Sequence, residues 1–380
     1  MFRLVPRRFF AGALLTGLAV AAGAAETGGE ATPAPTPTSV RAAPTRPEDV
    51  PAVEEPAPAT ATAPAPEESK APEAVAPAGA EVPAAEPALA PEAPPLPPVK
   101  DWLEAQVELS RRGFSCGSID GVPGPQTAAA LKAFQRNEGL RETGALDKAT
   151  KQSLLLTAPA LAPYKFDVVD LAKLRPVPAT WLEKSQQPEL SFSTALELAA
   201  ERCRASPAFL RKINPNFNWT SVLPGAVITA PAVTRSTAGA KVAKLHVRLA
   251  EHVLEAVDDT GRIILHCPVS IARNVEKRPV GELHVTVVIP DPVYTWDPEV
   301  FPESPESKVL THKLILPSGP NNPVGVAWIG LDLQGYGIHG TPEPENVGRT
   351  ESHGCFRLAN WDALALLGLA WTGLPVEVEP

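Results

Sequence analysis

The sequence predicts a multi-domain protein: a small all-α domain, a small α+β segment, and a β-rich domain with one short helix. Three observations lead to this fold class. Residues 27–99 are rich in proline, alanine and glutamate and contain no aromatic residue, so they cannot bury enough apolar surface to fold. From residue 100 onward apolar side chains recur at helical spacing. From Lys241 they alternate at every second position, as in half-buried strands.

The N-terminus has the pattern of an export signal, which we place at residues 1–25. Arginines precede an apolar run at 9–22 that ends in small residues. The run is short for a membrane span. We therefore expect cleavage and an exported protein of the periplasm or cell envelope, with no stable membrane span; an uncleaved anchor is the alternative. Residues 26–99 are then predicted to be a disordered, extended linker.

Charge is concentrated in this linker. The chain has a formal net charge of −9, of which residues 1–26 carry +2 and residues 27–99 carry −8, which leaves −3 for residues 100–380. The part predicted to fold is therefore close to neutral. It gives no reason to propose a nucleic acid as a partner.

Residues 100–157 are predicted to form the all-α domain. Asp101 can cap a first helix and Thr127 a second. The segment resembles the peptidoglycan-binding domain of type 1, which implies binding to the cell wall; a helical domain without a ligand is the alternative. The resemblance rests on Gly113-Phe114, Ile119-Asp120-Gly121, Gly124-Pro125-Gln126-Thr127, Ala130-Leu131 and Phe134-Gln135.

Residues 161–235 are predicted to form the α+β segment. Ser193 can cap a helix, a second helix covers 209–213, and a turn leads into a strand at 227–229. The order resembles a LysM repeat, with the first strand supplied from 164–166 across an insertion. The resemblance implies glycan binding, with a purely structural adaptor as the alternative.

Residues 242–379 are predicted to form the β-rich domain. Asn360 can cap its one short helix, which Gly368 can end. The expected strands lie at 245–249, 253–257, 263–269, 283–289, 327–331, 336–339 and 376–378.

The chemistry is predicted to lie in the 350–358 segment, where Cys355 follows a glycine among polar residues. A thiol attacks only as a thiolate, so it needs a base nearby. His339, sixteen residues earlier at a strand end, can supply that base, and the Gly340 carbonyl can orient its second nitrogen. Gly354 lets the backbone approach a substrate closely, and amides near Cys355 can hold an oxyanion.

Residues 242–379 are similar to the L,D-transpeptidase catalytic (YkuD-type) family. The similarity rests on His339, Ser352-His353-Gly354-Cys355 and Arg357, with 279–281, 321–325 and 336–342 in support. It implies a cysteine acyltransferase that needs no cofactor. Its roles would be Cys355 as nucleophile, His339 as proton donor and acceptor, His353 in support, the Gly340 carbonyl as orienting group, the Gly354 backbone in the oxyanion hole, and Ser352 and Arg357 toward the substrate.

The implied reaction begins at a tetrapeptide stem of peptidoglycan. Cys355 would attack the carbonyl on the L-centre of diaminopimelate and release D-alanine. An amine of another stem, or of a wall-attached lipoprotein, would then resolve the thioester. A hydrolase on the same acyl-enzyme and a non-catalytic wall-binding protein are the competing hypotheses. Zinc bound by His339, His353 and Cys355 is a weaker alternative, because no fourth ligand is evident.

The chain has four cysteines, and export makes disulfides possible. With Cys355 assigned to chemistry, we expect Cys116 to pair with Cys203, because both lie outside the catalytic region. Three unpaired, buried thiols, which include Cys267, are the alternative.

Overall fold

The computed structural model describes residues 96–234, 239–350 and 354–380. The predicted signal peptide, nearly all of the predicted linker, Ser352 and His353 lie outside these residues. Within the described part of the chain, no helix is both long enough and apolar enough to cross a membrane. The helical N-terminal region and the β-rich C-terminal domain predicted from the sequence are both confirmed.

The first module is helical. Asp101 caps its first helix by accepting the Glu104 backbone N–H at 2.9 Å. The predicted cap Thr127 is wrong: the second helix begins at Pro125, where a proline suits the first turn, and the Thr127 hydroxyl accepts from the Gln106 side chain instead. The helices are α1 (Trp102–Arg111), α2 (Pro125–Asn137) and α3 (Lys148–Ser153).

The second module begins and ends with strands that pair antiparallel, with Leu161 opposite Pro231. Two helices directly precede the last strand. The helix at Ala195–Arg202 is capped by Thr194, one residue after the predicted cap Ser193. Two more helices lie in the long connection that follows the first strand. The elements are β1 (Leu161–Lys165), α4 (Val168–Ala172), α5 (Trp181–Ser185), α6 (Ala195–Arg202), α7 (Pro207–Ile213) and β2 (Val227–Pro231).

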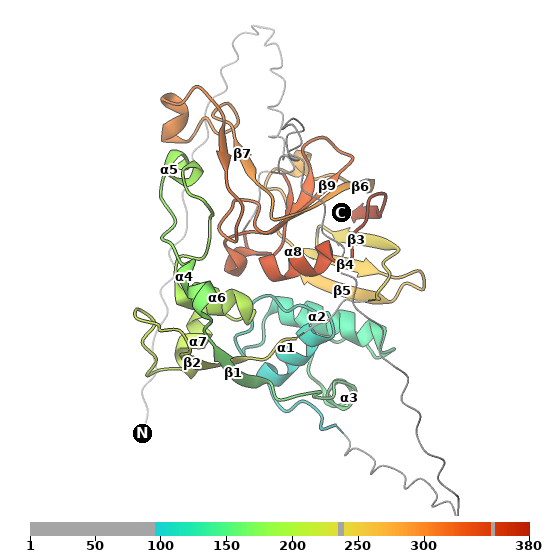
Figure 1. The fold of residues 1–380 in the computed structure, drawn as a ribbon. Coiled ribbons are helices and arrows are strands. Elements are labelled where there is room, and N and C mark those ends of the chain that lie inside the picture. The colour runs from blue at the N-terminus through green and yellow to red at the C-terminus, as the bar shows by residue number, and fades with distance from the viewer. Residues whose placement is uncertain (1–95, 235–238, 351–353) are drawn as a thin grey trace, which may run out of the picture. The chain divides into compact units, whose positions relative to one another are not determined.

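The third module is built on an eight-stranded sheet of order β11-β10-β9-β6-β12-β3-β4-β5. Figure 1 labels its strands β3, β4, β5, β6 and β9. The β10–β11 and β12–β3 pairs are parallel, and the other neighbours are antiparallel. The strands are β3 (Lys244–Arg248), β4 (Val253–Val257), β5 (Ile263–Pro268), β6 (Gly281–Pro290), β9 (Ala327–Leu331), β10 (Gly337–His339), β11 (Phe356–Arg357) and β12 (Pro375–Glu379).

A separate two-stranded excursion connects β6 to β9. It consists of β7 (Tyr294–Trp296) and β8 (Leu314–Leu316). The Trp181 ring, from α5 of the second module, stacks on Trp296 with centroids 5.9 Å apart, so the two modules share a small apolar cluster here. Three 3-10 turns complete the third module: η1 (Val275–Lys277), η2 (Pro305–Lys308) and η3 (Pro344–Asn346).

The α-helix of the third module, α8 (Asn360–Leu367), packs on the sheet (Figure 1). Its C-cap is Gly368, as predicted. The predicted N-cap Asn360 is wrong, because Ala359 occupies that position and the Asn360 side chain makes no capping bond. Asn360 is instead completely buried and hydrogen-bonded to other segments.

The first module covers the free edge of β5. The Ser115 backbone N–H donates to the His266 carbonyl oxygen at 2.8 Å, and the His266 backbone N–H donates to the Gly113 carbonyl oxygen. The Asn137 side chain exchanges two further hydrogen bonds with the Ile263 backbone. An exposed strand edge is prone to pair with other chains, so this docking protects the sheet as well as joining the modules.

The predicted Cys116–Cys203 disulfide is wrong, because neither Cys116 nor Cys203 forms a disulfide. Cys116 packs in the core of the first module and Cys203 in the core of the second. Cys267 lies on β5 and is fully buried in the core of the third module. Each thiol serves as a small apolar side chain in its own core, so the pair predicted from module position does not form.

Candidate active site

The candidate site lies where two short parallel strands meet. In the β10–β11 ladder Ile338 lies opposite Phe356, and His339 lies opposite Arg357. Cys355 directly precedes β11, two residues before Arg357. Because side chains alternate along an extended chain and partners across a ladder share a face, this register directs Cys355, Arg357 and His339 toward one side.

His339 is held as a neutral imidazole. Its side chain is buried, and its Nδ1–H donates to the Gly340 carbonyl oxygen at 2.6 Å. Burial lowers the pKa of His339 to about 4, with Arg357 contributing and the Gly340 bond opposing. With the proton on Nδ1, the lone pair lies on Nε2. The ring also stacks on Trp328, with centroids 5.7 Å apart.

Cys355 is a protonated thiol in this resting arrangement. Burial raises its pKa to about 11, while the Gly337 backbone N–H and the charge of Arg357 act in the opposite direction. Its Sγ lies 3.5 Å from the Gly335 carbonyl oxygen, to which the thiol can donate. The Cys355 thiol and the His339 imidazole are therefore both uncharged, and a thiol becomes nucleophilic when a base takes its proton.

Arg357 supplies positive charge at the site. Burial lowers its pKa, while Glu343 and Cys355 favour its charged form. A guanidinium stays protonated under all ordinary conditions. Arg357 can therefore stabilise an anion beside Cys355 or meet a substrate carboxylate.

Three aromatic residues lie near the thiol or the imidazole, and none of them was predicted from the sequence to act at this site. Burial and the charge of Cys355 both raise the pKa values of Tyr294 and Tyr336. Tyr336 donates its hydroxyl to the Lys277 carbonyl at 3.0 Å. The third is Trp328, which covers the imidazole. Only Tyr336 carried a local signal, because it opens the conspicuous run before His339.

The two glycines of the site differ in their surroundings. A side chain on Gly340 would overlap the Asn360 side chain, so no larger residue fits there without movement. A Cβ on Gly354 would meet only a Tyr336 ring carbon, at 3.9 Å. Ser352 and His353, the second of which is also a ligand in the zinc alternative, lie outside the described residues.

Two regions of the chain match known family models. Residues 243–378 match the family model described as "L,D-transpeptidase catalytic domain" (YkuD). Residues 99–154 match the model described as "Putative peptidoglycan binding domain". The C-terminal domain is thus similar to the L,D-transpeptidase catalytic domain, and the first module is similar to the peptidoglycan-binding domain.

Two curated relatives illustrate the similarity. "Putative L,D-transpeptidase YkuD" of Bacillus licheniformis is 41% identical over 61 residues, which is 16% of this chain and 37% of that protein. "Putative L,D-transpeptidase YqjB" of Bacillus subtilis is 34% identical over 103 residues, which is 26% of this chain and 49% of that protein. The chain therefore spans between a third and a half of the length of these relatives.

Solved structures show weaker overall similarity. An L,D-transpeptidase from Mycobacterium smegmatis is 19% identical, with 42% of this chain and 65% of that chain covered and a TM-score of 0.29. An L,D-transpeptidase from Xylanimonas cellulosilytica is 16% identical, with 76% and 100% covered and a TM-score of 0.31.

Proposed function

We propose that this protein is an L,D-transpeptidase of peptidoglycan that works through a thioester on Cys355, with His339 as its base. One observation carries the proposal. A buried, neutral imidazole, oriented by the Gly340 carbonyl, lies on β10. Strand β10 pairs with β11, which begins directly after Cys355. This arrangement lies inside the domain that matches the family.

In the first half-reaction the Cys355 sulfur attacks the carbonyl carbon on the L-centre of diaminopimelate in a tetrapeptide stem. His339 Nε2 takes the thiol proton as the S–C bond forms. The C–N bond to terminal D-alanine then breaks, and the imidazolium returns the proton to the leaving amine. A thioester and free D-alanine result.

In the second half-reaction an acceptor amine attacks the thioester. His339 takes the proton from the amine and returns it to the sulfur as the C–S bond breaks, which restores the resting pair. We assign the acceptor to another stem peptide, or to a lysine of a wall-attached lipoprotein. Backbone amides of Gly354 and Cys355 would hold the oxyanion.

The remaining assignments concern binding. Arg357 would meet a substrate carboxylate, and Ser352 would line the same pocket, with His353 in support. The first module would bind peptidoglycan. The second, whose β1, α6, α7 and β2 follow the order of a LysM repeat, would bind its glycan. Together they would hold the enzyme on the wall in the cell envelope.

The test incubates the purified protein with disaccharide-tetrapeptide and resolves the products by mass. Cross-linked dimers that lack one D-alanine are expected. Tripeptide monomer alone would instead indicate a hydrolase, and binding without any product would indicate a non-catalytic wall-binding protein. If Cys355→Ala or His339→Ala retained full activity, the assigned mechanism would be wrong.

A further inference from the structure

We propose that Glu201, on α6 of the second module, is a positioning residue for His339. It fixes the side chain of Asn360, which in turn supports the Gly340 carbonyl that orients the imidazole. This inference rests on the proposed function of His339. It gives the second module a part in catalysis that does not depend on binding glycan.

The first link is the Asn360 amide. Asn360 Nδ2 donates to Glu201 Oε2 at 3.2 Å and to the Pro320 carbonyl at 3.1 Å. Its Oδ1 accepts the Val326 backbone N–H at 3.3 Å. An amide has two donor hydrogens, and both are used, so a flipped Asn360 would lose these bonds in a fully buried place. Glu201 therefore helps to fix the direction of this side chain.

The second link is the contact between Asn360 and two glycines. A Cβ built on Gly340 or on Gly325 would overlap Asn360 Oδ1, so this oxygen packs directly against both backbones. The Gly340 carbonyl oxygen is the acceptor for His339 Nδ1–H. A displaced Asn360 would therefore release or push the peptide that holds the imidazole. A misplacement of about 1 Å can cost on the order of a hundredfold in rate.

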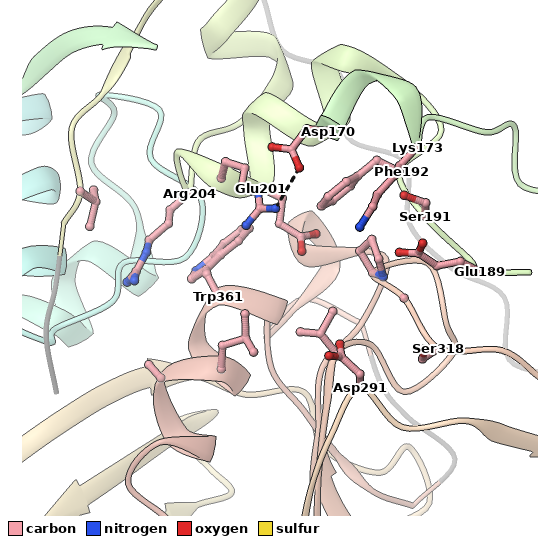
Figure 2. Close-up of a pocket in the computed structure, with 17 residues that line it drawn as sticks. Asp170, Lys173, Glu189, Ser191, Phe192, Glu201, Arg204, Asp291, Ser318 and Trp361 are labelled. Carbon is pink, nitrogen blue, oxygen red and sulfur yellow. Dashed lines mark hydrogen bonds and ion pairs between the residues drawn. The ribbon is translucent and has the colours of Figure 1, made fainter. Parts of the chain in front are cut away.

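The third observation concerns the free-energy cost of burying the Glu201 carboxyl group. Figure 2 shows its side chain among the residues that line a cavity between the second and third modules. The volume of this cavity is about 720 Å³. Burial raises the pKa of Glu201 to about 7, and the Asn360 hydrogen bond opposes that shift. An apolar residue would dock two modules without this desolvation cost. The retained carboxyl group is better explained by its bond to Asn360.

A matched control lies on the same helix. Glu197 Oε1 accepts from Asn321 Nδ2 at 2.6 Å, so it also joins α6 to the loop before β9. Its other oxygen accepts the Ser193 backbone N–H. Glu197→Ala therefore breaks at least as many bonds as Glu201→Ala, but none of them is a bond to Asn360, whose partners are Glu201, Pro320 and Val326.

The experiment uses the full chain and two readouts for Glu201→Ala, Glu201→Gln and Glu197→Ala. The first is the imidazole 15N resonance of His339, which reports its Nδ1 hydrogen bond. The second is kcat and KM with disaccharide-tetrapeptide. We expect Glu201→Ala to shift the resonance and lower kcat roughly tenfold with KM nearly unchanged. Gln, which keeps the acceptor oxygen, should restore both values, and Glu197→Ala should change neither.

Two results would overturn the proposal. One is an unchanged His339 resonance in Glu201→Ala; the other is an equal loss of kcat in Glu197→Ala, which would indicate simple docking. If the wild-type protein showed no turnover, the proposed function would fail, while the resonance would still test this inference. If Glu201→Ala did not fold, Glu201→Asp, whose shorter side chain retracts the carboxylate from Asn360, should give the same shift.

Discussion

The protonation state of the resting nucleophile gives a prediction that can be worked out in numbers. Burial raises the pKa of Cys355 from 9.0 to about 11. At pH 7 the thiolate fraction is then about one in ten thousand, roughly a hundredfold below that of an ordinary thiol. A thiolate of higher pKa is also more nucleophilic, by roughly tenfold for this shift. The two effects together predict alkylation roughly tenfold slower than that of a free thiol.

The assay is alkylation of the purified protein with iodoacetamide between pH 6 and pH 10, followed by intact mass. The rate at Cys355 should rise about tenfold for each pH unit throughout, because the thiolate fraction rises in proportion below the pKa. Cys355→Ser corrects for the three other thiols, which are all buried. A rate that became constant below pH 8 would mean a resting thiolate–imidazolium pair and would refute this account of the site.

Three further predictions follow from contacts of the same domain. Because burial lowers the pKa of His339 to about 4, the base is neutral above that pH, so kcat/KM should fall only near pH 4; an acid limb near 6.5 would contradict this. Gly340→Ala would overlap Asn360 and should cost about 1–3 kcal/mol and most activity, measured by urea unfolding and turnover, whereas Gly354→Ala should barely affect stability. Trp181→Ala removes the stack on Trp296, so hydrogen exchange should accelerate at 291–316, while unchanged protection would mean that the excursion holds itself.

The sequence predicts long, regular features better than short ones. Strands with a clear alternation, such as β3 (Lys244–Arg248), occur within one residue of where the pattern places them. Strand β11 has only two residues, too few to show any period. The β7–β8 excursion forms from strands of three residues that pair only with each other, and part of its apolar support comes from Trp181, which is distant in sequence. Their formation depends on tertiary contacts that a local pattern does not contain.

Asn360 shows why a correct local rule can fail. Asparagine at the start of an apolar helical pattern favours an N-cap, and the helix does begin at this residue. However, the side chain is used for hydrogen bonds to Glu201 on α6 and to Pro320 and Val326 in the β8–β9 connection. A single capping bond is replaced by three bonds at a buried junction, which is the more stabilising choice for a polar group out of contact with water.

The same junction changes how the upstream modules should be understood. The first module reaches α8 through the Ser115 hydroxyl, which donates to Asp362 at 2.8 Å. The second reaches it through Glu201, which accepts from Asn360. Both contacts meet the first turn of the helix that directly follows the strand carrying Arg357. Modules that served only as tethers would need no buried polar contacts with the catalytic domain. Because both modules make hydrogen bonds with α8, we expect the catalytic geometry to depend on the docking of all three modules.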